Sequence, residues 1–282
     1  SDLKPRYIVY RRKVRVKRFP FGVRQGILAM PMSWRIVSVL LTFALAAHAQ
    51  WDYRAAGIPR TADGKPNLSA PTPKTAWGTV DFSGVWQTDS KYNLNLAADL
   101  PKDAVPMTAW AQALYDERQR TNGATDPEGF CLPPGIPRVN GVPFPVKIVQ
   151  TPAVAVVLYE TRTTFRQIFL DNHKVIRDPN PTWMGYSTAK WDGDVLVVET
   201  VGFNDKTWLD DLGHPHSEQL RVTERWRRPS FGHMFVDITI TDPVAYTRPW
   251  TVTQEFLLAA DDELLEYVCG ENNLDPPHLV SK

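Results

Sequence analysis

The chain has 282 residues, and its formal net charge of +1 at pH 7 combines a basic beginning with an acidic remainder. Residues 1–49 hold ten Lys and Arg and one Asp, so the rest keeps 22 of the 32 basic and 30 of the 31 acidic side chains, a net charge of −8. An acidic chain lacks the positive surface that nucleic acid or anionic lipid requires, so neither is an expected partner. The remaining length, about 233 residues, suffices for one sizeable all-β domain.

Residues 32–49, MSWRIVSVLLTFALAAHA, have the pattern of a secretory signal peptide. A basic Arg35 precedes an apolar run, and small residues before the end predict cleavage after Ala49. The run is too short to span a bilayer and no second one follows, which predicts no stable membrane insertion after cleavage. We therefore expect export to the periplasm or the extracellular space. Residues 1–31 resemble translated sequence upstream of the start, with a basic nucleic-acid-binding arm as the alternative.

Residues 50–80 are rich in Pro, Gly and Thr and contain a short internal repeat. PRTADGKPNLSA (59–70) is echoed by PKTAWGTVDFSG (73–84), and the second copy continues into a predicted strand. The segment is interpreted as an extended N-terminal arm along the surface of a β-barrel domain that comprises residues 81–282. A flexible tether is the alternative.

The stretch DFSGVWQTD (81–89) opens this domain with Gly84 and Trp86 on a first strand. The Gly-x-Trp pair resembles the signature of calycins, the lipocalins and their relatives. The resemblance implies an antiparallel barrel in which the tryptophan closes one end and the glycine lets the backbone pass close beneath it. The alternative is a core tryptophan that follows a turn.

One amphipathic helix is predicted after this strand. Thr108 suits its N-cap, Trp110 and Leu114 share one face, and Gly123 ends it. The helix is expected to cover a barrel end or a sheet face. The five prolines of CLPPGIPRVNGVPFPVK (131–147) exclude a central strand or a helix from that segment.

The rest of the chain has the pattern of a β-meander. The predicted strands are 148–151, 154–160, 164–170, 185–191, 194–201, 218–227, 234–241, 250–258 and 263–269. In KWDGDVLVVET, Asp192-Gly193 suits a type I′ turn that pairs Ala189 with Leu196. With the first strand this makes about ten strands and predicts an all-β fold, either an antiparallel calycin-like β-barrel or a strongly curved sandwich.

Three stretches, TFRQIFLD, WDGDVLVVETVGFND and HPHSEQLRVTERWRR, are similar to an uncharacterised family of secreted bacterial proteins. The similarity covers most of the chain after residue 49. It implies export and implies no activity.

The chain contains two cysteines, Cys131 and Cys269. In an oxidising compartment an even pair predicts one disulfide. A bridge that closes so long a loop would stabilise the fold by roughly 4–5 kcal/mol in the chain-entropy model. Two separate buried thiols are the alternative, and neither cysteine has a recognisable nucleophile context.

The stretch SEQLRVTERWRRPSFGHMFVDITIT (217–241) predicts a second hairpin. Pairing about its central loop places Trp226 opposite Val236 and Glu224 opposite Ile238, all on one apolar face. A carboxylate on such a face is costly unless it is paired or protonated. Glu224 is therefore a candidate catalytic acid or base. The alternatives are a structural ion pair with an inward Arg and a bulge that turns the side chain outward.

His214, His216 and Glu218 alternate at the start of this hairpin. If the strand extends back in register, all three lie on the same inward side as Glu224, although Pro215 disfavours a paired central strand. His216 and Glu218 are then candidates for acid–base catalysis without a metal. A hydrogen-bonded loop is the alternative.

The same histidines are candidate metal ligands. Two imidazoles at i and i+2 with a nearby carboxylate suit Zn²⁺ or another divalent metal, so His214 and His216 are the predicted ligands. A third ligand would come from His233 or His173.

Two neighbouring loops carry polar and aromatic side chains that suit a ligand opening. The candidate ligand-binding residues are Trp183, Tyr186, Trp208, Asp210 and Asp211. The chain lacks a phosphate-binding Gly-rich loop, a G-x-S-x-G elbow and an H-E-x-x-H motif, which argues against nucleotide cofactors, α/β-hydrolase chemistry and zincin proteolysis.

We therefore expect an exported barrel that binds a small organic or carbohydrate-like molecule at its mouth. It would act on that molecule by acid–base or metal-assisted hydrolase, lyase or isomerase chemistry. The alternatives are a non-catalytic ligand-binding protein of the cell envelope and an interaction protein that uses the Pro-rich arm.

Overall fold

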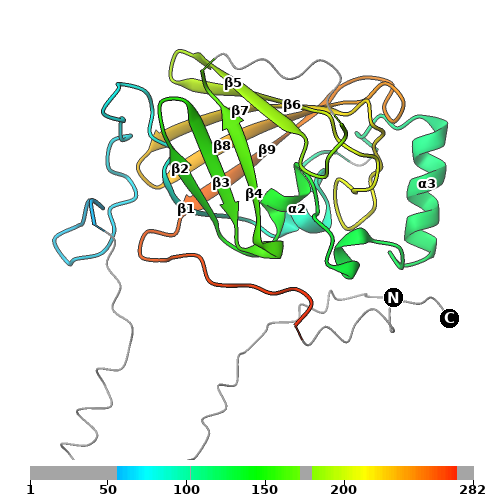
Figure 1. Ribbon diagram of the computed structural model, residues 1–282, viewed down its shortest axis with the longest axis horizontal. Helices are drawn as coiled ribbons and strands as arrows, with labels where there is room; N and C mark the ends of the chain where they lie inside the picture. Colours follow the sequence, from blue (N-terminus) through cyan, green and yellow to red (C-terminus); the bar gives the residue numbers. More distant parts are fainter. Residues whose placement is uncertain (1–55, 102, 172–179, 272–282) are drawn as a thin grey trace, which may run out of the picture. The chain divides into compact units, whose positions relative to one another are not determined.

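The structure, a computed structural model, describes residues 56–101, 103–171 and 180–271. These residues form a closed β-barrel in which nine strands neighbour one another in sequence order and the last pairs with the first (Figure 1). The strands are β1 Gly84–Thr88, β2 Val146–Gln150, β3 Val154–Tyr159, β4 Thr164–Phe169, β5 Tyr186–Asp192, β6 Val195–Val201, β7 Arg221–Ser230, β8 His233–Thr241 and β9 Trp250–Leu258. The expected all-β barrel is confirmed.

Two features of the strands differ from the expectation of about ten antiparallel ones. β4 and β5 run parallel, with Ile168 beside Ser187, whereas every other neighbouring pair is antiparallel. Residues 263–269 form no strand. They are held by isolated hydrogen bonds, such as that from Leu265 N to Glu160 Oε2 at 2.8 Å, and a strand needs a ladder of backbone bonds instead.

The β7–β8 hairpin has the predicted register. Glu224 pairs with Ile238 and Trp226 with Val236, and the side chains of β7 alternate between buried and more exposed positions. β7 continues through an irregularity as far as Ser230, so only Phe231 and Gly232 connect it to β8, instead of the predicted loop of residues 229–233. The inward orientation predicted for Glu224 is confirmed, since the residue is 0% exposed.

The register predicted for the β5–β6 hairpin is wrong by two residues. Ala189 pairs with Val198 instead of Leu196, because the two turn residues are Gly193 and Asp194. Only the first of them has a positive φ, +60°. A glycine at the first central position is typical of a type II′ turn, so the glycine begins the turn here and does not end it.

The barrel has two unlike ends. The turn end carries the start of β1 and the tight β2–β3, β5–β6 and β7–β8 turns. The loop end carries three long connections, residues 89–145, 202–220 and 242–249. Figure 1 shows α3 Ala109–Arg120 standing beside the yellow loops at this end.

Trp86 closes the turn end. Its Nε1 donates to the Phe82 carbonyl oxygen at 2.9 Å, and the indole is fully buried. Gly84 has φ +138°, and a Cβ there would lie 2.7 Å from Leu258 Cδ1. Only glycine meets both the backbone angle and the close approach of β9.

The two copies of the internal repeat form equivalent turns outside the barrel strands. Arg60 bridges Pro66 in the first copy, and Lys74 bridges Val80 at the matching positions of the second. The segment between the turns bonds to the turn end, where the Leu68 carbonyl oxygen accepts from the β7–β8 turn at 2.8 Å. Residues 59–84 thus contain two compact turns and are not uniformly extended.

The α3 helix begins as predicted. Thr108 accepts a hydrogen bond from Ala111 N at 3.3 Å, as an N-cap does. Trp110, which was predicted to share one face of the helix with Leu114, is 46% exposed. The helix turns Ala111 inward, and Tyr115, one turn later, contacts His214 of the 202–220 connection.

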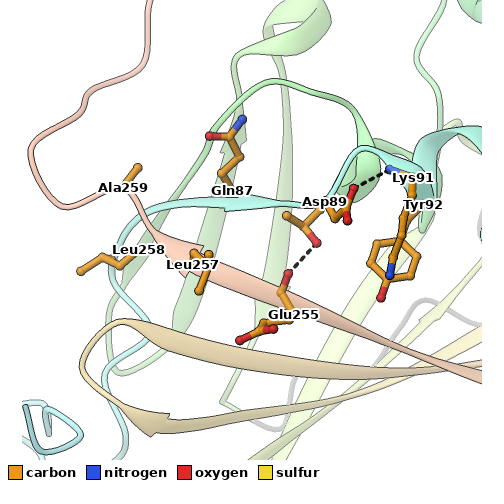
Figure 2. Close-up of a pocket in the computed structure, with 9 residues that line it drawn as sticks. Gln87, Asp89, Lys91, Tyr92, Glu255, Leu257, Leu258 and Ala259 are labelled. Atoms are coloured by element: carbon orange, nitrogen blue, oxygen red, sulfur yellow. Dashed lines mark hydrogen bonds between the residues drawn. The ribbon is translucent and has the colours of Figure 1, made fainter. Parts of the chain in front are cut away.

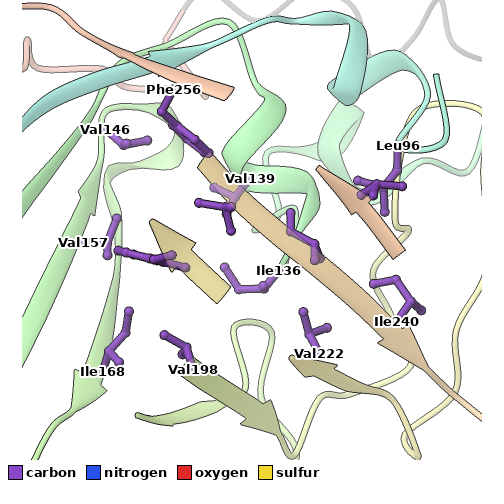
Figure 3. Packing of buried hydrophobic residues seen from close by; sticks show 14 of the residues in the cluster. Leu96, Ile136, Val139, Val146, Val157, Ile168, Val198, Val222, Ile240 and Phe256 are labelled. Atoms are coloured by element: carbon purple, nitrogen blue, oxygen red, sulfur yellow. The ribbon is translucent and has the colours of Figure 1, made fainter. Parts of the chain in front are cut away.

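The remaining helical segments are short. They are α2 Lys91–Leu94, η1 Pro127–Phe130, α4 Arg138–Gly141 and η2 Thr161–Thr163. α4 contradicts the predicted absence of a helix from 131–147, because Pro137 stands at its N-cap and no proline interrupts the helical turn. Ile136 and Val139 of this segment are 1% exposed and pack among the inward side chains of the strands (Figure 3).

The predicted disulfide is present. Cys131 and Cys269 are bonded, with their Cα atoms 5.6 Å apart, and join the 89–145 connection to the segment after β9. None of the described helices has the length and hydropathy needed to cross a membrane.

Candidate functional site

A band of polar side chains, here named the polar belt, lines part of the barrel interior. Five successive strands, β3 to β7, contribute one side chain each: Tyr159, Arg166, Ser187, Thr200 and Glu224. All are at most 3% exposed. The inward side chains of β8 and β9 are apolar apart from Gln254, so the interior wall formed by these two strands is hydrophobic.

Arg166 connects the members of the belt. Its Nε donates to Ser187 Oγ at 2.8 Å, and its Nη2 donates to Thr200 Oγ1 at 2.6 Å and to Glu224 Oε2. Ser187 Oγ and Thr200 Oγ1 are 2.9 Å apart. The guanidinium therefore reaches along the inner wall from β4 to β7 and forms a buried ion pair with Glu224.

Burial and charge act on these groups in opposite senses. Burial favours the neutral form of Arg166, but the charge and hydrogen bond of Glu224 outweigh it and raise the pKa of Arg166 above its usual value. Burial also raises the pKa of Tyr159, whose hydroxyl donates to Asn140 Oδ1 at 3.2 Å. The belt thus presents a charged but mutually neutralised pair beside an un-ionised phenol.

Several polar atoms in the interior have no hydrogen-bond partner among the described residues. In the belt these are Arg166 Nη1 and Glu224 Oε1. On β7 they also include Trp226 Nε1 and Ser230 Oγ, and on β9 Trp250 Nε1 and both polar side-chain atoms of Gln254. An unsatisfied buried polar atom costs about 1–3 kcal/mol, so a hydrogen bond from a water molecule or from a polar group of a ligand would stabilise these atoms.

Arg166 was not a predicted site residue. The stretch TFRQIF has an arginine beside a phenylalanine, and alternation alone favours the phenylalanine for the interior. The structure has the reverse: Phe165 is 57% exposed and Arg166 only 3%. The available signal was Glu224, since a buried carboxylate requires a cation from a neighbouring strand.

A second group of polar side chains lies in the 202–220 connection at the loop end. Asp210 is fully buried and accepts hydrogen bonds from Leu96 N at 2.8 Å and from His214 N at 3.1 Å. Its Oδ2 lies 2.6 Å from His214 Nδ1. This contact orients the imidazole with Nε2 away from the carboxylate, where no described residue bonds to it. The ring packs against Tyr115, with centroids 4.7 Å apart, and near Trp250 at 6.2 Å.

His216 is held differently. Thr207 Oγ1 lies 2.6 Å from its Nε2, and its Nδ1 lies 3.0 Å from the Ser217 carbonyl oxygen. The carbonyl can only accept, so Nδ1 carries the proton and Nε2 accepts from the threonine hydroxyl. Burial lowers the pKa of His216. Both ring nitrogens of this buried imidazole are therefore engaged by protein groups.

Glu218 does not lie on the inward side of a strand. It is exposed, and β7 begins only at Arg221. The preceding residues bond as a loop, with Ser217 N donating to Asp242 Oδ2 at 2.6 Å. The Pro215 carbonyl accepts from a tyrosine hydroxyl and takes no part in a ladder. The expected backward extension of the strand is wrong because Pro215 and these local bonds replace it.

The predicted metal site gains no further ligand. Among the residues that the structure describes, no group of three or more His, Cys, Asp and Glu side chains could hold a metal ion. His233 lies at the turn end, where its Nδ1 is 3.0 Å from Glu255 Oε1. His173 is outside the described residues. A zinc ion bound by His214 and His216 stays a prediction.

Trp208 is packed into the loop end. The guanidinium carbon of Arg118, from α3, lies 4.4 Å from its ring centroid, and Arg118 Nη1 donates to the Gly213 carbonyl oxygen at 3.0 Å. The indole is 4% exposed. It therefore joins α3 to the 202–220 connection and presents little surface to a ligand.

Asp211 belongs to an ionic cluster around the buried Arg138. Asp126 and Glu128 approach the same guanidinium, at 2.6 and 2.9 Å, and Asp211 is its third carboxylate. Burial raises the pKa of Asp211 to about 6, against the opposite effect of Arg138. The cluster holds α4 in the loop end.

Trp183 and Tyr186, the other predicted ligand-binding residues, are half-buried near the start of β5. The Tyr186 hydroxyl donates to the Asn180 carbonyl oxygen at 3.2 Å. Within the described ranges, no hydrogen bond or ring contact joins either side chain to Trp208. The structure does not bring the predicted aromatic walls together.

An open pocket of about 480 Å³ lies on the outer face of β1 and β9 (Figure 2). Its lining residues are Gln87, Thr88, Asp89, Lys91, Tyr92, Glu255, Leu257, Leu258 and Ala259. The Lys91 ammonium pairs with Asp99 at 2.8 Å, and Glu255 pairs with His233. None of the predicted site residues lines it, and it has no buried polar atom without a partner among the described residues.

Comparison with protein-family models, with curated proteins and with solved structures finds no match to this chain.

Proposed function

We propose that this protein is an exported, non-catalytic binding protein that holds a small organic molecule inside its barrel. The observation that carries the proposal is the pair of interior atoms, Arg166 Nη1 and Glu224 Oε1, that no described residue satisfies. Both atoms belong to the polar belt, whereas the inward side chains of β8 and β9 are apolar apart from Gln254. A small-molecule site is commonly an apolar enclosure with a few polar groups that fix orientation.

The ion pair favours binding over proton transfer at Glu224. A general acid or base must be free to meet the substrate and exchange a proton with it. Glu224 Oε2 is instead committed to Arg166, which is in turn anchored to Ser187 and Thr200. Such an anchored pair suits fixed recognition of a ligand.

Export is supported by the disulfide and by the signal-peptide pattern of residues 32–49. A disulfide between Cys131 and Cys269 persists in an oxidising compartment and is rare in a reducing one. The Gly84-x-Trp86 pair is also compatible with a calycin-like arrangement, because Trp86 closes one end of the barrel.

A thermal-shift screen of small neutral and charged organic compounds tests binding inside the barrel. Ala189 is an inward residue of β5, two positions from Ser187, and Ala189→Leu would fill the interior. Lys190→Leu, on the outer face of the same strand, is the matched control. We expect compounds that raise the melting temperature of the wild type and Lys190→Leu but not of Ala189→Leu. A screen without such compounds would contradict the proposal.

Catalysis is the second candidate, and the Asp210–His214 contact favours it. An imidazole that a buried carboxylate orients through Nδ1, and whose Nε2 bonds to no described residue, has the arrangement of a general base. It would support hydrolase, lyase or isomerase chemistry at the loop end. Conversion of an identified ligand, followed by NMR, that stops in Asp210→Asn would favour this function, whereas recovery of unchanged ligand would favour binding alone.

A further inference from the structure

We propose that the molecule held in the barrel bears an uncharged group with an adjoining acceptor and donor, namely a carboxamide, which lies against Arg166 and Glu224. This inference rests on the proposed function, since it assigns a ligand chemistry to the same interior. It follows from the charge of the pair, from its two unsatisfied atoms and from a second polar position further along β7.

Charge balance selects an uncharged group. Arg166 and Glu224 neutralise each other within the interior. Arg228, an inward cation on β7, donates to the carbonyl oxygens of Asp81 and Phe231 at the turn end. A carboxylate ligand would bring an uncompensated negative charge beside Glu224, and an ammonium would bring a positive one beside Arg166, each at a large desolvation cost.

The unsatisfied atoms select the donor and acceptor pattern. Arg166 Nη1 can only donate, and Glu224 Oε1, as a carboxylate oxygen, can only accept. Nη1 shares the guanidinium carbon with Nη2, and Oε1 shares the carboxylate carbon with Oε2. Nη2 and Oε2 form the ion-pair contact. A group that meets both must offer an acceptor and a donor side by side, as the C=O and N–H of a primary carboxamide do.

A second polar position lies two residues further along the same strand. Trp226 Nε1 is a donor without a partner among the described residues, and Gln254 has an unsatisfied donor and an unsatisfied acceptor. Both residues flank Val236 on the inner wall. Two residues along a strand correspond to about 7 Å, so a molecule that occupies both positions carries a second polar group roughly that far from its carboxamide.

Isothermal titration with matched compounds tests the inference. The probes are benzamide, benzoate and benzyl alcohol, which share a ring and differ in charge and in donor–acceptor pattern. We expect the wild type to bind benzamide roughly tenfold more tightly than the other two. In Glu224→Gln the guanidinium loses its counter-ion, and the preference should shift towards benzoate by a similar factor. Glu199→Gln, an exposed carboxylate on β6, is the matched control and should keep the wild-type preference.

A second variant keeps the test decisive if Glu224→Gln does not fold. Arg166→Met with Glu224→Leu removes both charges and leaves an apolar wall, which buried ion pairs commonly tolerate. This double variant should lose the preference for benzamide and bind toluene more tightly than the wild type does.

Three results would overturn the inference: benzoate binding as tightly as benzamide to the wild type, benzyl alcohol doing so, or Glu224→Gln leaving the order of affinities unchanged. If compounds bind in a manner that Ala189→Leu abolishes but without a preference for the amide, the inference fails and the proposed function stands. If no compound of the titration or the screen binds in that manner, both fail.

Discussion

Arg228 lies over the indole of Trp86, with its guanidinium carbon 4.7 Å from the ring centroid. The arginine comes from β7 and the tryptophan from β1, so the contact crosses the turn end of the barrel. Nε of Arg228 donates to the Phe231 carbonyl oxygen at 3.1 Å, and Nη1 donates to the Asp81 carbonyl oxygen. Burial lowers the pKa of Arg228 to about 10, against a smaller opposing effect of Asp81.

Arg228→Lys should destabilise the protein although it conserves the charge. A lysine ammonium is not planar and cannot donate in the directions of both carbonyl oxygens while covering the indole. We expect a loss of about 1–3 kcal/mol in the free energy of unfolding, measured with urea. Arg225→Lys on the exposed face of β7, where Arg225 pairs with Asp192, should change it by less than about 0.5 kcal/mol. Equal effects of the two variants would contradict this role of Arg228.

The Arg166–Glu224 pair should show strong coupling in a double-mutant cycle. Either Arg166→Met or Glu224→Leu leaves one buried charge without its partner, and each should cost about 3–5 kcal/mol. The double variant should recover much of that loss, because no unpaired charge remains. Urea unfolding of the four proteins measures the coupling, and additive losses would show that the two side chains are not interdependent.

The disulfide should contribute through the long loop that it closes. Cys131 and Cys269 are 138 residues apart, for which the chain-entropy model gives about 4–5 kcal/mol. Reduction, or the double change to Ser, should lower the melting temperature and the urea midpoint together. A reduced protein as stable as the oxidised one would mean that the unfolded chain gains little freedom when the bridge opens.

Acidification should weaken the loop end through His216. Because burial lowers the pKa of His216 in the folded state, the neutral ring is favoured there. This contribution to stability is present above the unfolded pKa of about 6.5 and is lost as the pH falls through the lower folded value. His216→Gln should therefore show a smaller loss of stability than the wild type between about pH 7.5 and pH 5. His233→Gln, which replaces a ring that is more than a third exposed, is the comparison for the general effect of removing a histidine. A His216→Gln variant that loses as much stability as the wild type on acidification would contradict this role of His216.

Strand register is predicted best where two long runs of alternating apolar and polar residues pair with each other. The β7–β8 register and the burial of Glu224 follow from such runs, because a slip by one residue would expose the whole apolar face. The β5–β6 register depends on whether Gly193 begins or ends a two-residue turn, and both turn types occur in hairpins. The error of two residues there comes from that ambiguity.

The candidate site was harder to predict because tertiary contacts decide it. The orientation of Arg166 depends on a carboxylate three strands away, which the pattern of β4 alone does not indicate. Residues 202–220 look like a ligand-binding mouth by composition. Their Asp210 and Trp208 are instead engaged by Leu96 and by Arg118 of α3, from segments distant in the chain.

An odd number of strands cannot alternate in direction all the way around a ring, so a closed barrel of nine must contain at least one pair that runs the same way. That mismatch falls between β4 and β5, whose backbone pairing is confined to Ile168–Ser187 and Phe169–Thr188. Arg166 spans this junction from β4 and bonds to Ser187 just across it. The side chain of Arg166 therefore adds a hydrogen bond between β4 and β5, the neighbouring strands of the described barrel that share the fewest backbone pairs.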